Sequence, residues 1–403
     1  MPGENILVIA VDGWRAASLG AYGNTSFSTP ALDQLAAESF LLDNCYADAV
    51  ELPQIYRALW QSCHPLRGDS RVAGPALPRL LAERGFAATL LTDEPALAQL
   101  SGAEAFGELV QLTDAAPARA DDAFQTGIAR LFTAACDELQ PSESKRLIWL
   151  HARGLYGPWD APLELQEPLL AHEEGDPPPC EDLLPPDIML DDSHDPDTAF
   201  RWSCAYAAQV MVLDACINAI RETLAEASDN GWLVVFLGLR GFPLGEHGRI
   251  GGIDGRLYVE QLHVPLLWRF PDGTGRLARS GELTSHLDLL PTLLDWVDGS
   301  VGLGSQSFDG ASLLPQIQLA DASARQELIA VGSGDTRAIR NAEWTFRRDD
   351  VASVDDIQGE LFVRPDDLWE ANDVAALCPE VVDNLASRLR DAIASFTAAA
   401  ESS

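Results

Sequence analysis

Three side chains that could take part in chemistry stand at the ends of apolar runs in this chain. Asp12 directly follows the run 5–11 (NILVIAV), and His151 lies near the end of the run 146–152 (RLIWLHA). Arg240 follows a third apolar run. In open α/β sheets, ligands and catalytic groups collect at the carboxyl ends of the strands. A carboxylate there could ligate a cation or form a salt bridge with a guanidinium.

The third run opens the stretch Val234–Gly248, VVFLGLRGFPLGEHG. Its first residues predict a buried strand, and the glycines and proline that follow predict a loop. The end of this strand offers Leu239 and Arg240. This pair leaves open whether the strand end is an active site or a place where one used to be.

The elements that must position these residues alternate between strands and helices. Strands are expected at 5–11, 87–93, 146–152, 263–270 and around 234–236 in the stretch GWLVVFLGLRG. Helices are expected at 29–40, 52–62, 76–86 (ended by Gly85), 120–139, 200–227 and 286–297. Buried apolar strands joined by crossover helices predict an α/β fold with a mostly parallel sheet. Residues 173–197 interrupt the pattern with ten acidic residues, six prolines and no Lys or Arg. We expect a surface loop or lid there, and a cation site is the less favoured alternative because no EF-hand spacing is present.

The C-terminal part changes character. Short strands are expected at 327–333, 336–349 and 359–365, and a last helix from Pro379 to about Ala399. We therefore predict an α/β domain over 1–318 and a C-terminal subdomain over 319–403, with a small antiparallel sheet and one packed helix.

Composition excludes several kinds of partner. The chain has 403 residues, with 27 basic and 62 acidic side chains and a net charge of −35. Such a surface repels nucleic-acid phosphates and anionic lipids, so neither nucleic acid nor membrane is expected as a partner. The seven cysteines show no zinc-site spacing, and the first residues resemble a strand more than a signal peptide. No stretch of 18 apolar residues is present, so we expect a soluble cytoplasmic protein.

Several segments, in their order along the chain, resemble the sulfatases of the alkaline phosphatase superfamily. They are NILVIAVDGWRAASLGAYGN, TPALDQLAAESFLLDNCYA, LGEHG…GRLYVEQLHVPLLWRFP, SHLDLLPTLLDWV, FDGASLLP and GELFVRPDDLWEANDVA. The resemblance runs from about residue 4 to 390. It implies the fold of that family, a mostly parallel sheet flanked by helices with a small C-terminal antiparallel subdomain.

The resemblance also implies a chemistry. Sulfatases hydrolyse sulfate esters with a formylglycine made from Cys or Ser in a C/S-x-P-x-R motif at a helix N-terminus, where anions are favoured. A calcium ion beside it is held by two Asp after the first strand and by an Asp-His or Asp-Asn pair after a late strand. In this chain the first pair is Asp12 and Gly13, and the late pair is Leu239 and Arg240.

The nucleophile position is also altered. No Cys, Ser or Thr occurs from Tyr46 to Gln61. Anchoring the motif on Pro53 places Glu51 at the nucleophile, and anchoring it on Arg57 places Pro53 there. Neither residue can become formylglycine, so we expect none. We also expect no calcium, because three of the four metal-ligand positions are changed.

The remaining family positions are mixed. The resemblance gives His247 a role in supporting the metal loop, although a hydrogen bond within the loop is an equal alternative. Arg256 takes the place of a family Lys and keeps its charge, but it cannot shuttle a proton. Tyr156 stands where the family has a His, and His151 could still face the cleft. Arg57 could bind an anion or form a surface salt bridge.

Asp12 and Arg240 carry the most specific hypothesis. Asp12 could be a residual metal ligand, but one ligand of four does not hold calcium, so a structural role is favoured. We expect Arg240 to form a salt bridge with Asp12, which would replace the metal by a fixed positive charge.

Two functions follow. The first is a degenerate sulfatase that acts by binding a small anion or a protein partner. The second is an active sulfate or phosphate ester hydrolase that works without metal, through Glu51 or a water activated by His151 or His247, with arginines as clamps. The second is less favoured because such esters hydrolyse very slowly without catalysis.

Overall fold

The computed structural model describes residues 5–68, 74–113, 117–170, 177–191, 193–226, 231–299, 308–319, 325–349 and 358–401. The chain divides into two compact units. Unit 1 consists of 1–43, 78–252 and 264–280, and unit 2 of 44–77, 253–263 and 281–403. These units do not coincide with the predicted domains 1–318 and 319–403, because three segments before residue 319 form one compact body with the C-terminal sheet.

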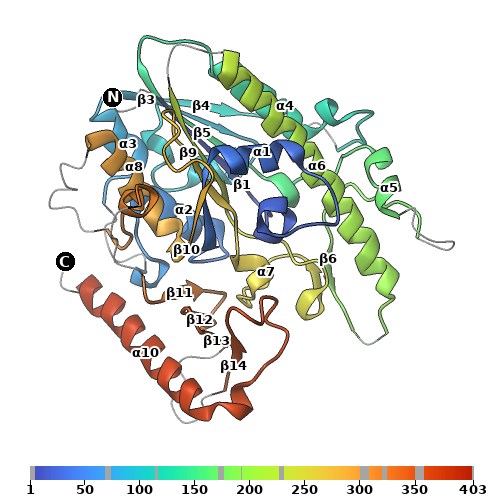
Figure 1. Ribbon diagram of the computed structural model, residues 1–403, viewed down its shortest axis with the longest axis vertical. Coiled ribbons are helices and arrows are strands. Elements are labelled where there is room, and N and C mark those ends of the chain that lie inside the picture. Colours follow the sequence, from blue (N-terminus) through green and yellow to red (C-terminus); the bar gives the residue numbers. More distant parts are fainter. Residues whose placement is uncertain are drawn as a thin grey trace. The chain divides into compact units, whose positions relative to one another are not determined.

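A large, mostly parallel sheet is the centre of unit 1 (Figure 1). Its strand order is β10-β2-β9-β7-β1-β5-β3-β4, and the last residues of β2 and β10 belong to unit 2. The strands are β1 (Asn5–Val11), β2 (Phe40–Tyr46), β3 (Phe86–Thr92), β4 (Glu108–Gln111), β5 (Lys145–Ala152), β7 (Trp232–Gly238), β9 (Leu266–Arg269) and β10 (Ala278–Ser285). β1 is parallel to both β5 and β7, while β9 is antiparallel to β7. The predicted α/β class is confirmed.

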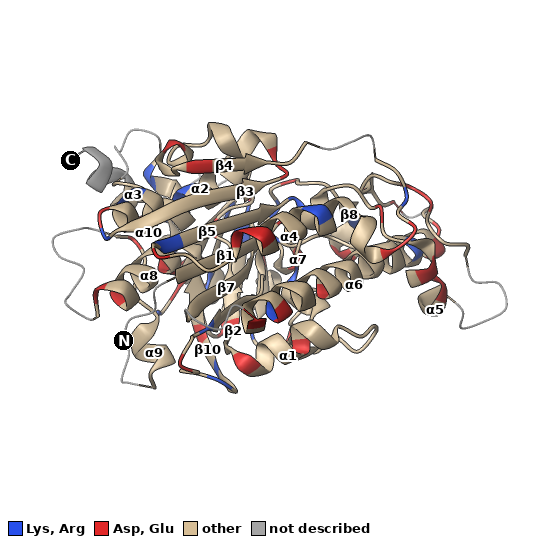
Figure 2. Ribbon diagram, turned by 90° about the horizontal axis from the view of Figure 1, so that it is seen from above, with Lys and Arg blue, Asp and Glu red and all other residues tan. Residues whose placement is uncertain are grey.

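Helices cover one face of this sheet. They are α1 (Pro30–Glu38), α4 (Gly127–Glu138) and α6 (Pro196–Glu226), with the short α3 (Leu77–Ala82) and α5 (Glu167–Leu170) elsewhere. Alternate residues of β1, β5 and β7, such as Ile9, Leu150 and Phe236, share one apolar cluster with residues of α1, α4 and α6. Figure 1 shows α6 running beside α4. Acidic residues lie on α1, α4, α5 and α6 (Figure 2), as the net charge of −35 requires.

α6 is long and apolar enough, by length and composition, to cross a membrane. However, 72% of its apolar window is buried inside the protein. A core helix passes the same test, and the shared cluster with the sheet explains the apolar composition of α6.

Several sequence-based boundaries need correction. The helix expected at 29–40 ends at Glu38, and the single strand expected at 336–349 is two strands, 337–340 and 344–348. The helix expected at 120–139 begins only at Gly127, because the Thr126 side chain accepts a hydrogen bond from the Ala129 N–H and caps it there. The helix expected at 76–86 ends at Ala82. The acidic segment 173–197 contains a short strand, β6 (Asp187–Met189), which pairs with β8 (Arg249–Gly251). Residues 173–176 and 192 of that segment lie outside the described residues.

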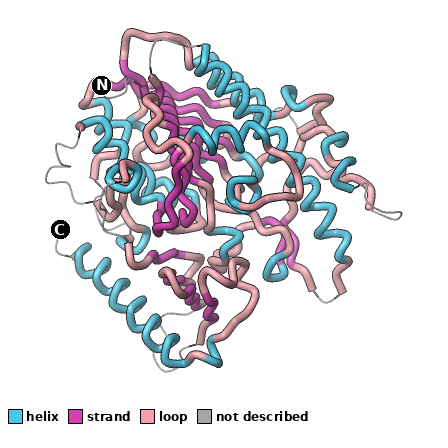
Figure 3. The backbone as a smooth tube through the Cα atoms, viewed as in Figure 1, coloured by secondary structure: helices cyan, strands magenta, loops and turns pink. Residues whose placement is uncertain are grey.

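Unit 2 contains the predicted small antiparallel sheet. Its strands are β11 (Leu328–Val331), β12 (Arg337–Arg340), β13 (Trp344–Arg348) and β14 (Glu360–Val363), in that order. The helix α10 (Pro379–Glu401) runs beside it (Figure 3). Leu385 and Leu389 of this helix share an apolar cluster with Ile339 of β12. The other helices of unit 2 are α2 (Leu52–Gln61), α7 (Val259–Leu262), α8 (Leu289–Asp298) and α9 (Leu314–Ile317).

Candidate functional site

The carboxyl ends of β1, β5 and β7 lie side by side in unit 1. Val11 of β1 is in register with both Ala152 of β5 and Gly238 of β7. The ladder continues one residue further, since the Asp12 N–H donates to the Ala152 carbonyl and the Leu239 N–H to the Val11 carbonyl. The parallel sheet therefore brings the residues after β1 and after β7 to one place, as the strand pattern predicts.

Asp12 and Arg240 form a two-point ion pair at this place. The Arg240 Nε–Asp12 Oδ1 distance is 2.9 Å, and the Nη2–Oδ2 distance is 2.8 Å. Asp12 is only 4% exposed and Arg240 only 7%. The Gly13 N–H also donates to Oδ1, at 3.0 Å. The predicted salt bridge is present, in the bidentate geometry that makes guanidinium–carboxylate pairs strong.

Tyr156 also contacts the guanidinium. The Arg240 Cζ lies 4.8 Å from the centre of the Tyr156 ring, within the range of a cation–π contact. The Tyr156 hydroxyl is 3.1 Å from the carbonyls of both Gly241 and Gly252 and shares its proton between them. The ring is thus fixed to the loop that carries Arg240.

His151 lies close to this pair but is fully buried. Burial lowers its pKa to about 3, and the positive charges of Arg240 and Arg153 lower it in the same direction. The imidazole is therefore neutral near pH 7 and is a weak base. This argues against His151 as the group that activates a water molecule.

The residues at the family's metal positions do not fit a calcium ion. Gly13 has a φ of +75°, and a Cβ placed on it would lie 2.8 Å from the Leu155 Cβ, so an acidic side chain has neither the backbone nor the room. Leu239 is fully buried and has no oxygen in its side chain. Of the four positions only Asp12 carries a carboxylate, and Arg240 already binds both of its oxygens. Calcium needs six or more oxygen ligands.

Sequence reasoning missed two further charged residues at this edge of the sheet. Asp93 directly follows β3, whose last residue Thr92 is in register with His151. The Asp93 carboxylate accepts a hydrogen bond from the Arg153 N–H at 2.7 Å. The same signal that singled out Asp12, a charged residue directly after a buried strand, is present in the segment AATLLTD (87–93).

His247 is also in unit 1, in the loop between β7 and β8. Its φ of +49° is left-handed, and glycines stand at 245 and 248. The preceding residue Glu246 fixes the loop through a 2.6 Å ion pair with Arg15 and a hydrogen bond from the Leu244 N–H. His247 is partly buried, and its two predicted roles stay predictions.

The other three candidates belong to unit 2. Glu51 is exposed and is the N-cap residue of α2, where its backbone carbonyl accepts the first helical hydrogen bonds. Arg57 is partly buried on the same helix. Arg256 is paired with Asp254 and lies 5.4 Å over the Tyr258 ring. Their catalytic or anion-binding roles stay predictions.

Comparisons with known proteins agree on the family and the fold. The family model described as Sulfatase matches residues 4–300. An N-acetylglucosamine-6-O-sulfatase of Bacteroides thetaiotaomicron is 30% identical over 115 residues, which are 28% of this chain and only 20% of that relative.

Solved structures resemble the chain over nearly its whole length. A phosphonate monoester hydrolase of Agrobacterium radiobacter has a TM-score of 0.77 at 17% identity and covers 98% of this chain and 96% of its own. A protein in complex with its substrate D-glucosamine-2-N,6-O-disulfate has a TM-score of 0.76 at 16% identity, with 98% of each chain covered. At these identities the likeness establishes the fold.

Proposed function

Because the chain belongs to the sulfatase family, we propose that it is a member in which a guanidinium has replaced the metal ion, and that it acts by binding and not by hydrolysis. The observation that carries the proposal is the buried ion pair between Asp12 and Arg240. A calcium ion at this place would meet one carboxylate and a fixed positive charge, and like charges repel each other strongly where water is excluded.

The ion pair also explains why Asp12 remains. A buried carboxylate without a partner is strongly destabilising, so in the absence of a metal an unpaired Asp12 would lower the stability of the fold. Arg240 supplies the missing positive charge and two hydrogen bonds. The strand end thereby becomes a structural element that needs no cofactor.

A second argument comes from the sequence between β2 and the end of α2. Residues 46–61 contain no Cys, Ser or Thr that could be converted to formylglycine. A hydrolase would need another nucleophile, and Glu51 is the residue that the motif alignment offers. The other route, a water activated by His151, is disfavoured because burial lowers the pKa of His151 to about 3.

Two measurements test the proposal. In calorimetry with calcium chloride, we expect no heat of specific binding and no calcium-dependent rise in melting temperature. Turnover of p-nitrophenyl sulfate and p-nitrophenyl phosphate should equal the uncatalysed rate, with and without divalent metal. Calcium binding that disappears in Asp12→Asn would overturn the proposal.

The same assay decides between this proposal and a metal-independent hydrolase. Turnover that is lost in Glu51→Gln, but kept in a matched substitution of an exposed carboxylate such as Glu83→Gln, would support the hydrolase. A binding screen should start from compounds that the names of the similar proteins indicate, N-acetylglucosamine 6-sulfate, D-glucosamine-2-N,6-O-disulfate and a phosphonate monoester. A protein partner and a cytoplasmic location are further proposals, supported by the composition.

A further inference from the structure

Asp48 lies on a short segment of unit 2, residues 46–49, that connects β2 with the start of α2. The segment is fixed on both sides, since the Ala47 N–H donates to the Leu262 carbonyl of α7, and the Val331 N–H of β11 donates to the Asp48 carbonyl, each at 2.9 Å. Two residues after it comes Glu51, the N-cap of α2. A change in the packing of Asp48 would therefore affect the place where β11, α7 and the start of α2 meet, which we call the join.

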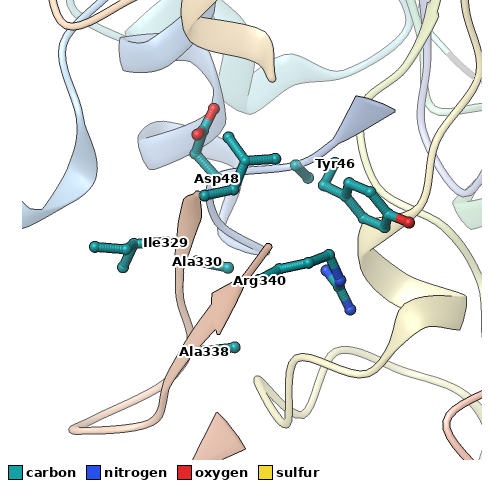
Figure 4. Close-up of a pocket in the computed structure, with 8 residues that line it drawn as sticks. Tyr46, Asp48, Ile329, Ala330, Ala338 and Arg340 are labelled. Carbon is teal, nitrogen blue, oxygen red and sulfur yellow. The ribbon is translucent and has the colours of Figure 1, made fainter. Parts of the chain in front are cut away.

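The Asp48 side chain is enclosed but incompletely bonded. The residue is 2% exposed, and among the described residues its Oδ2 has no hydrogen-bond partner. Figure 4 shows the carboxylate pointing away from Ala330 and Ala338, while the Arg340 guanidinium lies at the Tyr46 ring. Arg340 is paired with Glu370 and does not compensate Asp48.

Arg325 is the cation that acts most strongly on the pKa of Asp48, but its guanidinium is already paired with another carboxylate. Its Nη1 and Nη2 contact the two carboxylate oxygens of Asp288 at 2.7 and 2.5 Å. Asp288 is 1% exposed and accepts further hydrogen bonds from the Ser285 and Ala311 N–H groups. One guanidinium thus faces two buried carboxyl groups, and a second negative charge in this space would be uncompensated.

We propose that Asp48 is a proton-controlled latch of unit 2, which holds the join of β11, α7 and α2 when it carries a proton and weakens it on ionising. The protonated carboxyl is neutral and fits the buried site, whereas the carboxylate would share the one Arg325 guanidinium with Asp288 and lacks a full set of donors. The proposal is independent of whether the strand-end site in unit 1 binds or hydrolyses a ligand.

The titration behaviour of the site agrees with this geometry. Burial raises the pKa of Asp48 to about 7; Arg325 acts to lower it, Asp288 to raise it, and hydrogen bonds from Ser285 and Leu287 to lower it. The neighbouring Cys45 has its pKa raised by burial, so it stays an uncharged thiol near pH 7. The pKa of Asp48 is thus higher in the folded than in the unfolded chain, whose value is near 3.8. The proton stabilises the fold at low pH, and this stabilisation is lost as the pH rises to about 7.

The test compares urea unfolding of the full chain with that of Asp48→Asn between pH 5 and pH 8. The variant keeps the shape and cannot ionise. Over this range, the wild-type unfolding constant should rise about a hundredfold relative to that of the variant. Asp43→Asn, which removes a carboxylate of β2 that is paired with Arg279, serves as the matched control and should follow the wild type. Parallel pH profiles of wild type and Asp48→Asn would overturn the proposal.

Hydrogen exchange keeps the proposal testable if Asp48→Asn does not fold. After correction for intrinsic rates, the peptide covering 46–52 of the wild type should lose protection between pH 5 and pH 8. The β1 peptide 5–11, in unit 1, should change less. Equal changes in both peptides, or none in 46–52, would contradict a local latch.

Discussion

The Arg240 guanidinium contacts the Asp12 carboxylate at 2.9 and 2.8 Å, and its Cζ lies 4.8 Å from the centre of the Tyr156 ring. Asp12 and Arg240 are buried and Tyr156 is partly buried, so the two charges depend on each other. Arg240→Met should therefore leave Asp12 as an unpaired buried charge and lower the free energy of unfolding by about 3–5 kcal/mol. Urea unfolding at pH 7 measures this.

A control and a rescue sharpen that prediction. Arg269→Ala breaks a more exposed pair with Glu38 and should cost about 1 kcal/mol or less. The double variant Asp12→Asn/Arg240→Met removes both charges and should recover part of the loss. If Arg240→Met unfolds no more easily than Arg269→Ala, the ion pair does not hold the strand end together.

Gly13 should be unable to regain the family's second acid. Its φ of +75° and the 2.8 Å approach of a Cβ to Leu155 make any side chain costly there. Gly13→Ala should lower the free energy of unfolding by about 1–3 kcal/mol. Gly23→Ala, with a φ of +99° but nothing within 4 Å of its Cβ, separates backbone strain from the clash. Equal losses in the two variants would mean that Leu155 moves aside without cost.

Tyr156 should contribute through two separable interactions. Tyr156→Phe removes the hydroxyl that bonds to the Gly241 and Gly252 carbonyls and should cost about 0.5–1.5 kcal/mol. Tyr156→Leu also removes the ring under Arg240 and should cost about 0.5–1 kcal/mol more. Thermal unfolding of the two variants gives both values. An identical loss in both would show that the ring does not stabilise the guanidinium.

The strand-end site could be predicted in outline because its signals are local. Asp12 and Arg240 follow apolar runs, and parallel strands bring their carboxyl ends together. The packing around the pair depends on contacts between distant segments. The approach of Leu155 to Gly13 and the ring of Tyr156 under Arg240 leave no mark in the local sequence.

The same distinction applies to the fold. Thr29 directly precedes α1 and is of a type that favours the N-cap position. Its side chain makes no capping hydrogen bond, and Asp214 of α6 accepts from the Leu32 N–H instead. This partner is 182 positions away in the chain. The division into compact units likewise depends on which distant segments pack together, and a change of composition near residue 319 does not reveal it.

Two buried histidines should make the chain sensitive to acid. Burial lowers the pKa of His151 to about 3 and that of His64 to about 4, both below the ordinary value of 6.5. The His64 Nδ1 accepts a hydrogen bond from the Leu66 N–H, so its Nε2 carries the proton that is donated to the Ile329 carbonyl. Protonation of Nδ1 would break the first of these bonds.

The sign of the pH effect follows from these shifts. Between about pH 4 and 6.5 the two histidines bind protons in the unfolded chain but not in the folded chain, so the free energy of unfolding falls as the pH falls. Each histidine should contribute a loss of about 2 kcal/mol between pH 7 and pH 5.

Asp48 acts in the opposite direction over the same range, so each histidine must be measured as the difference between the wild type and one variant. Urea unfolding of His151→Gln and of His64→Gln should show a smaller loss on acidification than the wild type shows. If the difference between wild type and His151→Gln stays constant from pH 7 to pH 5, then His151 takes up its proton in the folded protein, and the strand-end site is open to water.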